Sequence, residues 1–123
     1  MRTILVVEDE YLAAIDLARQ IIRVGFDVHC ESMGLRAVEV AAGMDIEAAI
    51  VDIQLPDISG RDVVKELRKC GSVLPIIVCT AYASEHLQWA CDAGLPIIQK
   101  PVDEGLLVTT LRRHLGQDRV RLI

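Results

Sequence analysis

The chain has 123 residues, of which 52% are hydrophobic, so we expect one compact domain with its own core and no room for a second. Its formal net charge of -5 argues against a nucleic-acid-binding surface, because such a surface needs clustered Lys and Arg to neutralise phosphates. The N-terminus runs directly into a short strand, so we predict no signal peptide, no membrane-spanning segment and a cytoplasmic location.

The first third of the chain predicts two strands separated by a helix. Residues 3–7 form a continuous aliphatic and β-branched run, typical of a strand buried on both faces, and three acids, Glu8–Glu10, follow it. Residues 11–25 have apolar side chains at helical spacing and end at Gly25. Residues 27–31 alternate polar and apolar, as in an edge strand with one exposed face, where we place His29. The residues expected to face inward from the helix are Ala14, Leu17, Ala18, Ile21 and Ile22.

The middle of the chain continues this alternation. Residues 34–43 predict a second helix, residues 48–51 a buried strand that delivers Asp52 at its end, and residues 60–70 a third helix. Pro56 lies in the intervening turn. The apolar faces expected of the two helices are Leu35, Val38, Ala41 and Ala42, and then Val63, Val64 and Leu67.

The last third predicts two further strands and two helices. Residues 74–79 form a buried strand that ends at Thr80, and a helix capped by Ser84 runs to Ala93 and stops at Gly94. Residues 96–99 form a short fifth strand that ends at Lys100. Asp103 caps a last helix whose expected inward face is Leu106, Leu107, Leu111 and Leu115.

Five strands alternating with five helices indicate an α/β fold, with a doubly wound parallel sheet, helices on both faces and right-handed crossovers. We assign residues 1–116 to this domain, and residues 117–123 to a tail or the start of a linker.

The four cysteines, Cys30, Cys70, Cys79 and Cys91, show no CxxC or CxxH spacing. Three of them fall where a small apolar residue would serve, so we predict buried, reduced thiols and no zinc site.

Polar side chains follow four of the predicted strands: Glu8 and Asp9, then Asp52, Thr80 and Lys100. In an open parallel sheet these strand ends share one edge, where ligands bind. A single aspartate after a strand is also a common turn former or helix cap. The prediction of a functional site therefore depends on all of these residues occurring together. Three acids without a nearby His or Cys form an oxygen-only site that suits Mg²⁺.

With a cation bound, Asp52 would stay ionised and could attack phosphorus as a carboxylate nucleophile, forming an acyl phosphate. Lys100 and the Thr80 hydroxyl would then stabilise the phosphoryl oxygens, because phosphoryl transfer depends on positioning and charge stabilisation.

Four motifs together resemble the CheY-like receiver domains of two-component response regulators, from Thr3 to about Leu115. They are Val7-Glu8-Asp9-Glu10, Asp52 followed by Pro56 and Gly60, Thr80-Ala81, and Lys100-Pro101. The resemblance implies a flavodoxin-like (βα)5 three-layer sandwich with strand order 2-1-3-4-5, and a cis peptide before Pro101.

The resemblance also implies roles for individual residues. Asp52 would accept a phosphoryl group from a histidine kinase or phosphotransfer protein. Asp9 would bind Mg²⁺ directly, Glu8 through water, and Gln54 through its backbone carbonyl.

The chain departs from the family at one position. Most receivers have Tyr or Phe three residues before the lysine, whereas this chain has Ile97. A smaller subfamily with Phe-Ala-Thr-Gly-Tyr at the fourth strand and an aliphatic switch residue is closer, although Val78-Cys79 replaces Phe-Ala and Ala81 replaces Gly. Our hypothesis is that residues 81–85 and the fourth helix carry the output change. Tyr82 is either part of this switch or a half-exposed loop aromatic.

Trp89 lies in the predicted fourth helix. It is either an anchor for partners or a homodimer, in the surface of the fourth helix, fifth strand and fifth helix, or a residue packed on its own domain. His86 and His114 lie near helix ends and are assigned no role.

Three functions are compatible with these residues. The first is a phosphoaccepting receiver that catalyses only its own phosphorylation and dephosphorylation and signals to a downstream protein or effector domain. The second is a phosphorylation-independent interaction or dimerisation module, which would not need Glu8, Asp9, Asp52, Thr80 and Lys100 together. The third is a phosphatase of the haloacid-dehalogenase kind, which would have an acid in place of Gln54 and a cap insertion. We predict the first.

Overall fold

The computed structural model of the chain describes residues 2–70, 73–81 and 87–116, and within them five parallel strands form one sheet in the order β2-β1-β3-β4-β5. The strands are β1 (Thr3–Val7), β2 (Asp27–Glu31), β3 (Ala48–Asp52), β4 (Ile76–Thr80) and β5 (Ile97–Gln99). The helices are α1 (Tyr11–Arg23), α2 (Gly34–Gly43), α3 (Gly60–Cys70), α4 (Gln88–Asp92) and α5 (Glu104–Leu115). The predicted flavodoxin-like fold and strand order are confirmed.

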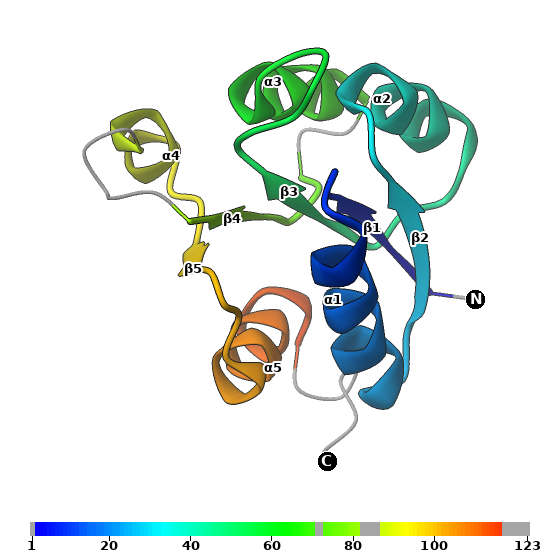
Figure 1. The fold of residues 1–123 in the computed structure, drawn as a ribbon, viewed down its shortest axis with the longest axis vertical. Helices are drawn as coiled ribbons and strands as arrows, with labels where there is room; N and C mark the ends of the chain where they lie inside the picture. Colours follow the sequence, from blue (N-terminus) through cyan, green and yellow to red (C-terminus); the bar gives the residue numbers. More distant parts are fainter. Residues whose placement is uncertain (1, 71–72, 82–86, 117–123) are drawn as a thin grey trace.

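The sheet lies between two helical layers, with α1 and α5 on one face and α2, α3 and α4 on the other (Figure 1). Each face has its own apolar cluster. In β1, Ile4 and Val6 belong to the cluster under α1 and α5, whereas Leu5 and Val7 belong to the cluster under α2, α3 and α4. Both faces of the strand are therefore covered, which explains its continuous aliphatic sequence.

Several element boundaries differ from the prediction. β4 begins at Ile76 rather than residue 74, and β5 begins at Ile97 rather than residue 96. α4 spans residues 88–92 with Leu87 at its N-cap, so it is shorter than predicted, and the predicted cap Ser84 lies outside the described residues. The two predicted glycine stops are supported, because Gly25 and Gly94 have φ values of 102° and 70° just beyond their helices.

Some residues predicted to face the core are exposed. Ile22, Leu35 and Leu106 expose 56%, 59% and 47% of their surface, and Ala42 is exposed too. In α1 and α5 the adjacent residue, Ile21 or Leu107, takes the core position, and successive residues of a helix point about 100° apart. In α2, Gly34 and Ala37 are the buried residues, and the predicted Val38 and Ala41 pack against the same core cluster, so the prediction is wrong only for Leu35 and Ala42.

The prediction of buried thiols is correct only for Cys79, which lies in the fully buried strand β4. Cys30, Cys70 and Cys91 are exposed. Cys30 lies on the edge strand, Cys70 is the last residue of α3, and Cys91 follows the buried Ala90, so the sheet covers none of these thiols.

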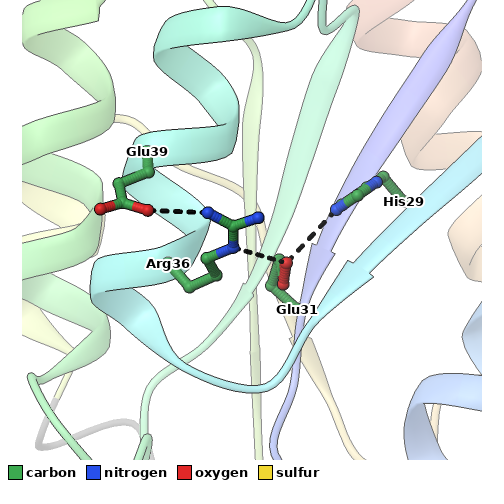
Figure 2. Close-up of polar contacts among 4 residues, drawn as sticks. All are labelled: His29, Glu31, Arg36 and Glu39. Carbon is green, nitrogen blue, oxygen red and sulfur yellow. Dashed lines mark hydrogen bonds and ion pairs between the residues drawn. The ribbon is translucent and has the colours of Figure 1, made fainter.

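The edge strand β2 is joined to α2 by a chain of polar contacts (Figure 2). His29 Nε2 lies 3.4 Å from Glu31 Oε1, and Arg36 Nε lies 3.6 Å from the same oxygen. Arg36 Nη1 continues the chain to Glu39 Oε2 at 2.8 Å. The His29 side chain is 34% exposed, in keeping with its predicted place on the exposed face. Its contact is with Glu31, which belongs to the same edge strand.

Across residues 2–70, 73–81 and 87–116, every helix is too short or too polar to span a bilayer.

Candidate active site

The strand register brings the predicted site residues to one edge of the sheet. Val7 is paired with Val51, so Glu8 and Asp52 leave neighbouring strands at the same level. On the other side of β3, Asp52 is paired with Cys79, the residue before Thr80. The Lys100 amide donates to the Thr80 carbonyl oxygen at 2.8 Å, which fixes the end of β5 against β4.

Three carboxylates converge at this edge. Glu8, Asp9 and Asp52 each have an oxygen within 4.8 Å of the others. Glu8 and Asp52 are buried, with exposed fractions of 3% and 7%, and Asp9 is exposed. They line a hollow of about 400 Å³ whose walls are Glu8, Asp9, Glu10, Asp52, Gln54, Ala81 and Lys100.

The Lys100 ammonium lies between two of the acids. Its Nζ forms an ion pair with Glu8 Oε1 and lies 3.3 Å from Asp52 Oδ2. The Lys100 side chain is only 18% exposed, so water screens these charges less than at an open surface. Lys100 therefore offsets part of the repulsion between two carboxylates that the sheet buries together.

The remaining carboxylate oxygens accept backbone hydrogen bonds. Glu8 Oε2 accepts from the Glu10 amide at 3.2 Å, and Asp52 Oδ1 accepts from the Gln54 amide at 3.3 Å. Each bond is local in sequence, so both side chains are oriented by the turn that directly follows their own strand.

The two buried acids differ in their affinity for protons. Burial, and then the nearby Glu8 carboxylate, raises the pKa of Asp52 from 3.8 to about 6. Burial alone would also raise the pKa of Glu8, but hydrogen bonds from Lys100 and the Glu10 amide hold that pKa below its usual value. Burial opposes the charge of Lys100 as well, yet its contacts with Glu8 and Asp52 raise the Lys100 pKa. Without a further cation, Asp52 is the acid whose charge is least stabilised.

This donor set fits a hard divalent cation. The three carboxylates supply oxygen ligands only, and no His or Cys belongs to a metal-binding group within the residues that the structure describes. Gln54, which lines the same hollow, follows Asp52 by two residues. A bound cation would offset the repulsion that raises the Asp52 pKa.

A glycine allows the chain to turn closely beneath Asp52. The Gly60 amide donates to the Ile53 carbonyl oxygen at 2.8 Å. A Cβ atom on residue 60 would lie 2.5 Å from the Asp52 carbonyl oxygen and 2.6 Å from the Ile53 Cα. Only glycine fits this approach, so α3 begins directly below the acid that β3 delivers.

Asp57 was not among the predicted site residues, but it anchors the loop between β3 and α3. Its two carboxylate oxygens accept the amides of Gly34 and Leu35, both at 2.8 Å. These amides belong to the first turn of α2, whose N–H groups lack partners within the helix. They also hold the pKa of Asp57 below its usual value. The only sequence signal was an acid placed after Pro56 in a turn.

The remaining predicted site residues do not all lie in the acidic hollow. Thr80 is 1% exposed and lies at the end of β4, whereas the next residue, Ala81, lines the hollow. Ile97 is half-buried and packs on the cluster under α2, α3 and α4, and Trp89 is half-buried on the same cluster. Tyr82 and His86 lie outside the described residues. The peptide between Lys100 and Pro101 is cis, as the resemblance implied.

Known proteins share both this sequence pattern and this fold. The sequence profile of the response regulator receiver domain matches residues 4–112. The transcriptional regulatory protein CusR of Escherichia coli K12 is 36% identical over 84 residues, which cover 68% of this chain and 37% of CusR. TctD of Salmonella typhimurium LT2 is 32% identical over 123 residues, which cover 93% of this chain and 54% of TctD. The chain thus spans about a third to a half of these two relatives.

Solved structures agree with the sequence relatives. The receiver domain of a Pseudomonas aeruginosa PAO1 sensor histidine kinase superposes with a TM-score of 0.84 at 28% identity, covering 93% of this chain and 97% of that one. In that structure a magnesium ion is coordinated in the active site cleft. The profile match covers most of the chain, and the fold superposes on that of a solved receiver domain. This protein therefore belongs to the family of response regulator receiver domains.

Proposed function

We propose that this receiver domain accepts a phosphoryl group on Asp52 from a histidine kinase or a phosphotransfer protein. The observation that carries the proposal is the position of the Asp52 carboxylate, with Lys100 Nζ 3.3 Å away and oxygens of Glu8 and Asp9 within 4.8 Å. A buried nucleophile surrounded by one ammonium and two further acids suits phosphoryl transfer better than structural capping.

In the proposed step, an Asp52 carboxylate oxygen attacks the phosphorus of a phosphohistidine. The bond between phosphorus and the imidazole nitrogen breaks, and the imidazole leaves with the bonding electrons and takes up a proton. Lys100 then pairs with a phosphoryl oxygen, and the Thr80 hydroxyl donates to another. This limits the chemistry of the chain to its own phosphorylation and the later loss of the phosphoryl group.

We propose Mg²⁺ as the cation, held by Asp9, by Glu8 through water, by Asp52 and by the backbone carbonyl of Gln54. The oxygen-only donor set and the partial exposure of the site support this choice, because Mg²⁺ keeps several waters when it binds protein. When bound, it would neutralise the carboxylates and the incoming phosphoryl oxygens.

We propose that the output passes through residues 81–85 and α4. Ile97 supports this, because it packs on the same apolar cluster as Ala90 of α4. Amide hydrogen exchange with and without beryllofluoride tests it, and we expect changed exchange rates in residues 81–92. Unchanged rates there, with changes confined to α1, would contradict this route.

We infer that the partners are proteins: a kinase or phosphotransfer protein upstream, and a downstream protein or effector domain. The negative net charge supports an output that does not use direct contact with nucleic acid or membrane, and a cytoplasmic setting. A homodimer through α4, β5 and α5 is a further expectation, and sedimentation with and without beryllofluoride tests it. Residues 117–123 are proposed as a tail or linker.

The decisive experiment is intact mass spectrometry after incubation with acetyl phosphate and Mg²⁺. We expect a gain of one phosphoryl group that requires Mg²⁺ and is absent in Asp52→Asn. Asp57→Asn is the matched control, since it removes a carboxylate only a few residues away and should keep the gain. A gain that persists in Asp52→Asn would contradict the assignment.

If acetyl phosphate causes no gain in mass, two explanations remain, and a measurement of Mg²⁺ and beryllofluoride binding distinguishes them. If the wild-type chain gains no mass but binds beryllofluoride, the site accepts phosphate only from its protein donor. If it binds neither Mg²⁺ nor beryllofluoride, the domain is a phosphorylation-independent interaction module.

A further inference from the structure

A second concave site, separate from the acidic hollow, lies between α3 and α4. It has a volume of about 590 Å³ and is lined by Arg61, Val64, Lys65, Arg68, Lys69, Trp89 and Ala93. It shares no residue with the hollow that contains Asp52. Both helices lie on the same face of the sheet (Figure 1). We call this site the α3–α4 groove.

The α3–α4 groove is basic, although the chain as a whole has a net charge of -5. Arg61, Lys65, Arg68 and Lys69 follow one another at intervals that place them on one stripe of α3. Val63 and Leu67 are buried against the sheet, so this stripe points away from the core. Asp62 and Glu66 alternate with these cations along the sequence, but neither is among the described residues that line the groove.

Within the part of the chain that the structure describes, the acids of α3 and α4 do not line the α3–α4 groove. Glu66 pairs with Lys69 at 3.0 Å from the side of α3, and Asp62 lies on that same side. Asp92 of α4 accepts a hydrogen bond from Gln88 at 2.8 Å. Among the described residues that line the groove, four are basic and none is acidic, and Glu66 offsets the charge of Lys69 from outside the groove.

The floor of the α3–α4 groove is apolar. Val64 is 6% exposed, Trp89 is half-buried, and Ala93 lies just beyond the end of α4. An apolar side chain seated against the Trp89 ring would lose contact with water, and carboxylates on either side of it would meet the cations of α3. Tryptophan and arginine together are also the residue types that dominate binding energy at protein interfaces.

We propose that the α3–α4 groove binds a short acidic segment of a partner protein, anchored by one apolar side chain against Trp89. From Arg61 to Lys69 the stripe is about 12 Å long at about 1.5 Å per residue, which matches roughly four residues of extended chain. A longer polyanion such as nucleic acid would extend beyond this stripe onto a negatively charged domain. A short acidic peptide segment is therefore the occupant that fits both the charge and the length.

The test uses the intrinsic fluorescence of Trp89, which is the only tryptophan in the sequence. The full chain is titrated with a ten-residue peptide of aspartate and glutamate around one central leucine. We expect a saturable change in emission that weakens when the salt concentration rises from about 0.01 M to about 0.1 M, as the Debye length falls from about 30 Å to about 10 Å. A peptide with lysine and glutamine at the acidic positions should cause no change.

Two charge reversals make the test specific to the groove. Lys65→Glu is expected to weaken binding of the acidic peptide about tenfold, which corresponds to about 1.4 kcal/mol. Arg19→Glu changes the net charge equally on an exposed residue of α1, on the opposite face of the sheet, and should bind like the wild type. Both variants should keep phosphoryl uptake from acetyl phosphate, which reports that they are folded.

Four results would overturn the proposal. They are an unchanged Trp89 emission at millimolar peptide, equal weakening by Lys65→Glu and Arg19→Glu, stronger binding of a single-stranded DNA oligonucleotide than of the peptide, and a Trp89 change that tracks formation of a dimer in sedimentation.

Discussion

Removing the charge of Asp52 should stabilise the metal-free fold at neutral pH. The folded protein raises the pKa of this carboxyl from 3.8 to about 6, first through burial and then through Glu8. The folded state therefore holds the proton more tightly than the unfolded chain does, and ionisation of Asp52 costs folding free energy. Asn keeps the shape of the side chain and carries no charge, so Asp52→Asn avoids that cost.

The magnitude follows from the size of the shift. A rise of about two pKa units corresponds to about 3 kcal/mol at about 1.36 kcal/mol per unit. The cost is small at about pH 4, close to the unfolded pKa of 3.8, and it is complete well above about pH 6, where the carboxyl is ionised in both states. The gain from Asp52→Asn should therefore be small at pH 4 and about 3 kcal/mol at pH 8, or roughly 10 °C in Tm.

The assay is urea unfolding of both proteins in EDTA between pH 4 and pH 8. Addition of Mg²⁺ should stabilise the wild type at pH 8 and leave Asp52→Asn nearly unchanged, because the variant lacks one of the proposed ligands. A variant that is less stable than the wild type at pH 8, or a difference in stability that does not vary with pH, would contradict a charge cost at Asp52.

Three further substitutions test the surroundings of the site. Asp57→Asn should be destabilising above about pH 4, with an effect that fades as pH falls through the lowered pKa of Asp57; an effect that grows toward acid would contradict the bonds to α2. Gly60→Ala should lower the free energy of unfolding in urea by about 1–3 kcal/mol and slow phosphoryl uptake, because the added Cβ would meet the Asp52 carbonyl oxygen. Wild-type values for both stability and uptake would refute this close approach. Asp103→Ala should cost about 1 kcal/mol in thermal unfolding with normal uptake, because the Asp103 side chain caps α5 by accepting the Leu106 amide at 2.9 Å; an unchanged Tm would refute it.

The fold could be predicted because its signals are local and repeated. Each buried strand is a short aliphatic run, and each alternates with an amphipathic segment, so a parallel sheet with helices on both faces followed from connection rules. The strand order was implied only by the resemblance to receiver domains. The site could be predicted for the same reason: in a parallel sheet, residues that follow different strands share one edge. Glu8, Asp52 and Lys100 meet there without any contact along the sequence.

What the sequence could not supply was the choice between neighbours and the long-range polar contacts. Ile21 and Ile22 are chemically alike, and only the packed structure decides which one faces the sheet. Asp57 bonds to an amide 23 residues away, and no spacing rule relates two loops at that separation. The orientation of Trp89 toward α3 likewise depends on how two helices cross the sheet.

Each helical layer packs on its own apolar cluster, so the core residues under one layer can change during evolution separately from those under the other. Val6 and Val7 are adjacent in β1 but pack into different clusters, so a change of volume under α1 and α5 need not disturb the packing under α2, α3 and α4. Compensating substitutions would therefore be expected within one layer rather than between the layers. A lineage can remodel the outer surface of one layer for new partners while the strand ends, which both layers share, keep their chemistry.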